Sequence, residues 1–135
     1  AHAFWDSWLH ERDILVPLGL EPEVQSDELW AATWYSLVAG LAQGGLLGDP
    51  APVGPGTAEP FEVEIVFDEF PDRGLRLGVD TGVSIHEVPT PDSSSVANVG
   101  SALELVEYFT GRETTTDVRL PDPLAEHLDR ARQIL

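Results

Sequence analysis

Residues 61–88 read FEVEIVFDEFPDRGLRLGVDTGVSIHEV, and they give the clearest secondary-structure pattern in the chain. Apolar residues alternate with polar or small ones along three short runs, a period-two pattern typical of strands with one buried and one hydrated face. Turn-forming residues separate the runs at 71–74 (PDRG) and 80–82 (DTG). We therefore predict an antiparallel meander. Its inward face is expected to hold Phe61, Val63, Ile65, Phe67, Leu75, Leu77, Val79, Val83 and Ile85.

Helical patterns lie on both sides of this predicted sheet. Residues 2–16 and 27–43 precede it, and 102–109 and 124–135 follow it, each with apolar residues three or four positions apart. An extended piece at 114–120 is a candidate for a further strand. The expected fold class is α+β, in which two N-terminal helices are followed by a small antiparallel sheet with helices on one face.

The first helical pattern has an unusually wide apolar arc. It includes two tryptophans, a phenylalanine and a leucine, and such an arc needs partner helices in water. We expect these side chains to pack on the second helix, around Trp30 and Trp34, or to form an apolar patch that attracts another chain. The residues concerned are Phe4, Trp5, Trp8 and Leu9.

Composition divides the chain and limits its partners. Residues 1–47 form a helical segment, 48–60 a Pro/Gly-rich loop and 61–135 an α/β unit.

The formal net charge of −17 argues against nucleic acid and against anionic membrane surfaces as partners. No apolar run has the ~18 residues of a membrane span, and cysteine is absent. These features predict a soluble, cytoplasmic protein. Because methionine is absent and Ala1 opens directly onto helical sequence, we expect a piece of a longer polypeptide.

Asp6 and His10 are the candidate metal ligands. They lie four residues apart on the first predicted helix, so both side chains project from the same face, together with His2 and Asp13. A carboxylate and an imidazole at this spacing can each donate one ligand to zinc or nickel. An ordinary solvated acid–histidine pair has the same spacing, and two ligands alone do not complete a zinc site.

The stretch WDSWLHERDI at 5–14, followed by PLG at 17–19, resembles the last bundle helix of the DinB-like metal-binding superfamily. More closely, it is similar to the actinobacterial mycothiol-dependent maleylpyruvate isomerase family. The resemblance implies that Asp6 and His10 are metal ligands, that an earlier helix supplies a further histidine, and that mycothiol is the thiol cofactor. Residues 61–135 are similar to the sterol-carrier-like domain of that family. The helix within residues 100–112 and the Gly-Arg pair that ends this stretch occur in the same order as in that domain.

Two functions remain open on this basis. The first is a carboxy-terminal part of a metal-dependent isomerase or transferase that acts on a small molecule. The second is a non-catalytic module for small-ligand binding or association, with the missing bundle or another copy as partner. No metal is expected to bind tightly to this chain alone.

Other polar residues offer weaker signals. His86 and His127 are expected to face solvent, and Ser93–Ser95 to lie in a loop. Arg112 can bind an anion or stabilise a helix C-terminus.

Overall fold

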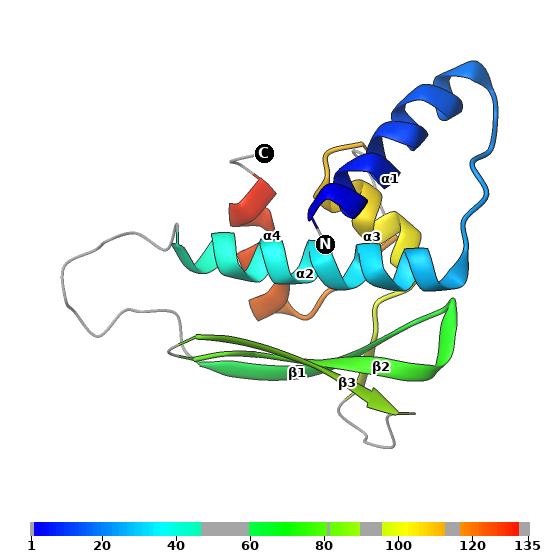
Figure 1. Cartoon of the computed structure of the whole chain (residues 1–135). Helices are drawn as coiled ribbons and strands as arrows, with labels where there is room; N and C mark the ends of the chain where they lie inside the picture. Colours follow the sequence, from blue (N-terminus) through cyan, green and yellow to red (C-terminus); the bar gives the residue numbers. More distant parts are fainter. Residues whose placement is uncertain (1, 47–59, 81, 90–95, 113–116, 133–135) are drawn as a thin grey trace.

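The fold consists of helices on one face of a four-stranded sheet (Figure 1). The computed structural model describes residues 2–46, 60–80, 82–89, 96–112 and 117–132. The described helices are α1 (His2–Leu15), the 3-10 helix η1 (Val16–Leu18), α2 (Ser26–Leu46), α3 (Ala102–Phe109) and α4 (Asp122–Arg132). The described strands are β1 (Phe61–Phe67), β2 (Phe70–Val79), β3 (Val83–Pro89) and β4 (Val96–Asn98). The α+β class and the order of helices and strands are confirmed.

The predicted meander is present as β1, β2 and β3, which pair antiparallel in sequence order. Alternation follows the prediction, since the fully buried side chains of the inward face include Ile65, Leu75 and Leu77. Glu62, one position from Val63, is exposed. Val83 differs from the prediction because 40% of its surface is exposed. It begins β3 opposite Val79, next to the turn at the end of the hairpin.

The first turn lies earlier than predicted. The chain reverses at Asp68 and Glu69, whereas residues 71–74 belong to β2. The β1–β2 register is irregular here: Val66 pairs with Gly74, but Phe67 pairs with Phe70. The PDRG residues therefore form an irregularity inside a strand, a position that tolerates a proline without a ladder hydrogen bond. The burial of Phe70 against Trp30, with ring centroids 4.7 Å apart, favours this arrangement over a turn at 71–74.

The fourth strand was not predicted. β4 pairs parallel with β1, which makes the sheet mixed, with order β3-β2-β1-β4. Of the expected extended piece, 113–116 lies outside the described residues, and 117–120 has no regular secondary structure. One backbone hydrogen bond, from Arg119 N to Val99 O at 3.1 Å, attaches this segment beside β4.

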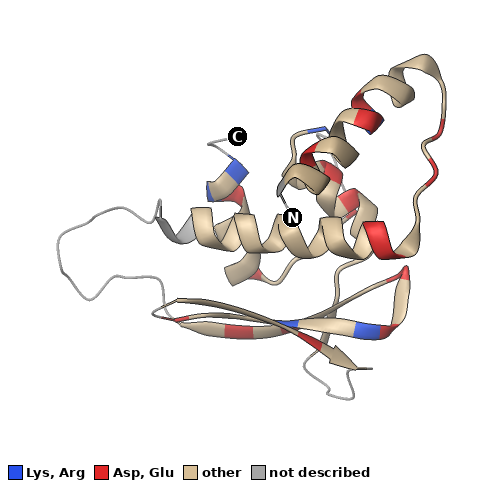
Figure 2. Ribbon diagram, viewed as in Figure 1, with Lys and Arg blue, Asp and Glu red and all other residues tan. Residues whose placement is uncertain are grey.

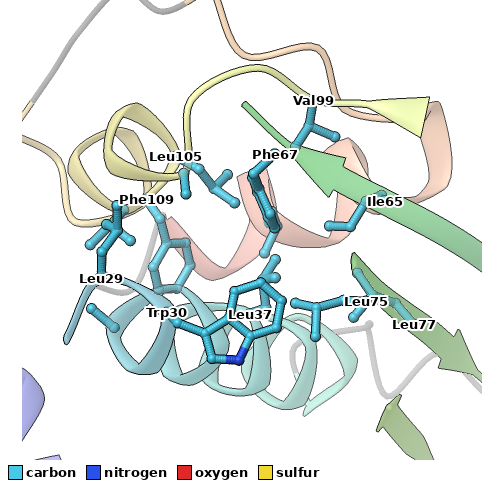
Figure 3. Close-up of a cluster of buried hydrophobic side chains, with 14 of the residues drawn as sticks. Leu29, Trp30, Leu37, Ile65, Phe67, Leu75, Leu77, Val99, Leu105 and Phe109 are labelled. Carbon is cyan, nitrogen blue, oxygen red and sulfur yellow. The ribbon is translucent and has the colours of Figure 1, made fainter. Parts of the chain in front are cut away.

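Helix α2 is the centre of the hydrophobic core. Its buried residues Trp30 and Leu37 face the sheet, and α3 and α4 flank it (Figures 1 and 3). Leu105 and Phe109 of α3 join the same cluster as Leu75 of the sheet (Figure 3). The helical part and the sheet part expected from the sequence therefore share one core. The expected Pro/Gly loop lies outside the described residues except for Pro60.

His127 is buried, contrary to the prediction of an exposed histidine. It is 4% exposed and packs edge-to-face on Phe61 of β1, with ring centroids 5.4 Å apart. The reason is the buried stripe of α4, in which His127 lies between Leu124 and Leu128 on one helical face. The apolar spacing predicted this stripe, but His127 was assigned to the polar face of the helix although it lies three residues after Leu124.

Helix α1 packs on α2 through its aromatic arc, which is the first of the two arrangements expected from the sequence. Trp8 and Leu9 are buried, and the Trp5 ring lies 5.2 Å from that of Tyr35. Trp5 Nε1 also donates a hydrogen bond to Ser36 Oγ at 3.0 Å. Phe4 remains 38% exposed at the edge of this contact.

Candidate functional site

The Asp6 and His10 side chains project together from the exposed face of α1. Asp6 Oδ1 lies 3.5 Å from His10 Nε2, and the two side chains are 56% and 68% exposed. The four-residue spacing produces this proximity because one helical turn separates the two positions. Neither side chain is directed into the α1–α2 contact, so both are accessible to a ligand from outside the chain.

The distance between the two ligand atoms suits a shared metal ion. Zinc binds nitrogen and carboxylate oxygen at about 2.1 Å, so two ligands on one tetrahedral ion lie about 3.4 Å apart. The 3.5 Å between Asp6 Oδ1 and His10 Nε2 matches this separation. Within the described part of the chain, no group of three or more His, Cys, Asp or Glu side chains is arranged to hold a metal. Asp6 and His10 are therefore two candidate ligands whose separation is compatible with one shared ion.

Asp13 and Arg112 support His10 from its other side. Asp13 Oδ2 lies 3.8 Å from His10 Nδ1, the ring nitrogen that faces away from Asp6. Arg112, just after α3, donates from Nε and Nη2 to the two carboxylate oxygens of Asp13 at 2.7 and 2.6 Å. These hydrogen bonds and the positive charge of Arg112 lower the pKa of Asp13 below its usual value. At 3.8 Å the carboxylate is too far from Nδ1 for a hydrogen bond, but it lies beside the ring nitrogen through which metal-binding histidines are usually oriented.

Arg12 anchors the helix that carries the site. It is 8% exposed, forms an ion pair with Glu107 of α3, and stacks on the Trp8 ring with 5.1 Å between Cζ and the ring centroid. Sequence reasoning missed this pair, although Arg12 falls one turn after Trp8 on the apolar arc. A charge at such a position signals a partner elsewhere in the chain. Together, Arg12–Glu107 and Asp13–Arg112 attach α1 to the end of α3.

The remaining candidate residues do not gather into a second cluster among the described residues. His86 is exposed on β3, as predicted, and pairs across the strands with Arg76. Ser93–Ser95 lie outside the described residues. A shallow pocket of about 600 Å³ lies at the end of the β2–β3 hairpin. Its lining includes Phe61, Val79, Val83, Glu62, Asp80 and Ser84.

Acidic residues are spread over α1, the linker to α2 and the sheet, with few Arg residues between them (Figure 2). The described helices include none long and apolar enough to cross a bilayer. The fold and site define an α+β protein with an exposed acid–histidine pair on its first helix. Comparison with known proteins found no matching family model and no significantly similar curated protein or solved structure.

Proposed function

We propose that the chain is the carboxy-terminal part of a metal-dependent isomerase or transferase that uses a thiol cofactor of the mycothiol type. The observation that carries this proposal is the 3.5 Å separation of Asp6 Oδ1 and His10 Nε2 on an exposed helix face. The resemblance of residues 5–19 to the mycothiol-dependent maleylpyruvate isomerase family supports the thiol and the small-molecule substrate. The absence of cysteine agrees with a cytoplasmic location.

Each residue of the site has a proposed task. Asp6 and His10 hold the divalent ion, zinc or nickel, and a histidine from an earlier helix completes the set. Asp13 orients the His10 ring through its Nδ1 side, and Arg112 keeps Asp13 ionised and in place. When bound, the metal supplies the Lewis acidity that keeps a coordinated thiol deprotonated at neutral pH.

Metal analysis of the intact polypeptide tests this proposal. We expect about one divalent ion per chain in the purified protein, lost in the His10→Ala and Asp6→Asn variants. His86→Ala is the matched control, because His86 is an exposed histidine on the sheet. Any thiol-dependent activity of the intact protein, with mycothiol supplied, should disappear together with the metal. An intact protein that contains no metal and gains none on dialysis against zinc or nickel would contradict the proposal.

The shallow pocket near Phe61 supports the second candidate, a non-catalytic binding module. Its lining combines apolar side chains with Glu62 and Asp80, which suits a small apolar ligand with a cationic group. A metal-free intact protein whose Phe61 and Val79 amide signals shift on addition of such a ligand would favour this module over the enzyme.

A further inference from the structure

Strongly exposed apolar side chains lie just beyond the end of α1. Val16 and Leu18 of η1 have 53% and 69% of their surface exposed, and Leu20 has 53%. We call these three residues the η1 tip. Figure 1 shows this end of α1 projecting away from the sheet and the other helices. The tip follows the last residue of α1, so it lies past the helix face that carries Asp6 and His10.

The backbone holds the η1 tip in one shape. Gly19 N donates to Val16 O at 3.0 Å, and Leu20 N donates to Leu15 O at 3.1 Å. Gly19 has a φ of 73°, the left-handed conformation that closes a helix end, and the ring of Pro17 fixes its own φ. The exposed apolar side chains therefore belong to an ordered turn. A surface that is already ordered loses less conformational entropy when it binds a partner.

Acidic residues flank the η1 tip. Glu11 of α1 and Glu21 and Glu23 of the linker to α2 are exposed, on either side of the tip in the sequence (Figure 2). Arg12 is buried in an ion pair, and the sequence has no lysine or arginine from residue 13 to residue 72. The tip is therefore an apolar surface with a negatively charged rim.

These two properties together select a partner. Leu18 and Leu20 are covered best by apolar side chains, because such a contact removes apolar surface from water. The acidic rim attracts Lys or Arg side chains. It repels a second copy of this chain, whose net charge is −17, and it repels an anionic bilayer. An amphipathic helix with an apolar face and basic margins satisfies both requirements.

We propose that the η1 tip is a docking site for a basic amphipathic helix of another protein. Apolar residues of that helix cover Leu18 and Leu20, and its Lys or Arg side chains approach Glu21 and Glu23. The candidate metal ligands take no part in this contact, so the docking site is independent of the proposed function.

A helical peptide of about 14 residues, with Leu on one face and Lys on the other, is the probe for this site. Added to the isotope-labelled 135-residue chain, it should shift the amide signals of residues 16–23 before those of the sheet. Leu18→Ser combined with Leu20→Ser should weaken binding about tenfold, since two apolar contacts are lost. Phe4→Ser is the matched control, because Phe4 is an exposed apolar residue at the opposite end of α1, and it should bind like the unchanged chain. Circular dichroism verifies that the variants keep the fold.

Two further peptides separate the apolar contact from the charge. Replacing Leu by Ser in the peptide keeps its positive charge, and replacing Lys by Glu keeps its apolar face. Each of these peptides should bind about tenfold more weakly than the probe. Equal binding of the peptide with Ser and Lys, undiminished binding to the double leucine variant, or no shift at residues 16–23 would overturn the proposal. A dimer of the unchanged chain in sedimentation velocity that dissociates in the double variant would also overturn it, because a second copy would then cover the tip.

Discussion

Glu69 shows how much one side chain contributes far from its own position. Glu69 lies in the turn between β1 and β2. Its carboxylate accepts hydrogen bonds from Ala102 N and Leu103 N, both at 3.1 Å. It also accepts one from Ser101 Oγ at 3.3 Å, while Ser101 Oγ accepts from Glu104 N. The first turn of α3 is thus capped by its own N-cap serine and by a carboxylate from the sheet. This contact connects the turn at Asp68–Glu69 to the start of α3.

Replacing Glu69 by Ala should lower the free energy of unfolding by about 1 kcal/mol, the usual cost of losing a helix cap. The physical reason is that two backbone N–H groups at the start of α3 lose their partner, together with a favourable charge at the helix N-terminus. Urea denaturation measures the change. Glu21→Ala, at an exposed acidic residue of the linker, is the control and should leave the midpoint nearly unchanged.

The ion pair between Asp13 and Arg112 should make a pH-dependent contribution. Because the hydrogen bonds and charge of Arg112 lower the folded-state pKa of Asp13 below its ordinary value of 3.8, the pair stabilises the fold above that pH. The contribution disappears as the pH falls through the folded-state pKa. At neutral pH a double-mutant cycle of Asp13→Asn and Arg112→Gln should give a coupling below about 1 kcal/mol, since Asp13 is 44% exposed. An undiminished coupling at a pH well below the folded-state pKa would contradict this assignment.

At the scale of elements, α2 unites the helices with the sheet. Gly40 on α2 lies where α3 and α4 converge, and an added Cβ there would lie 2.4 Å from Leu128 Cδ2 and 3.0 Å from Phe109 Cε2. Leu128 and Phe109 are both almost completely buried, so neither has free space into which to move. The absence of a side chain at Gly40 therefore sets the close approach of three helices.

Gly40→Val should accordingly destabilise the protein by about 2 kcal/mol through overpacking. The higher helix propensity of valine compared with glycine offsets only a few tenths of this loss. Thermal denaturation measures the effect. Ala42→Val, at an exposed position on the same helix, provides the control for a branched residue in α2 and should change stability little. Equal stability of the two variants would show that α3 and α4 can separate at this point.

At the scale of the whole molecule, α1 is attached differently from the other helices. Its inner side packs on α2 through Trp8 and Leu9, and two ion pairs connect it to α3 and the residues after it. Its outer side has no packing partner among the described residues, which is why Asp6, His10 and Ile14 are all exposed. The molecule therefore fixes α1 from its inner side and leaves the candidate ligands exposed on its outer side.

Local periodicity in the sequence was sufficient to predict much of the secondary structure of this protein. Alternation along 61–88 predicted the meander, and the spacing of Leu105, Val106 and Phe109 predicted α3, because burial of one face selects residues two or about three and a half positions apart. The four-residue separation of Asp6 and His10 likewise predicted their shared helix face. Each of these features depends on residues that are close in sequence.

Features that depend on partners distant in the sequence became visible in the folded chain alone. The PDRG residues at 71–74 have strong turn propensity, yet the burial of Phe70 on Trp30 keeps them in a strand. His127 is buried because α4 lies against β1. The hydrogen bonds from Arg112 to Asp13, 99 residues apart, place the Asp13 carboxylate 3.8 Å from His10 Nδ1. Local sequence spacing was enough to place most helices and strands, whereas packing determined which of their residues meet, because contact energies act between neighbours in space.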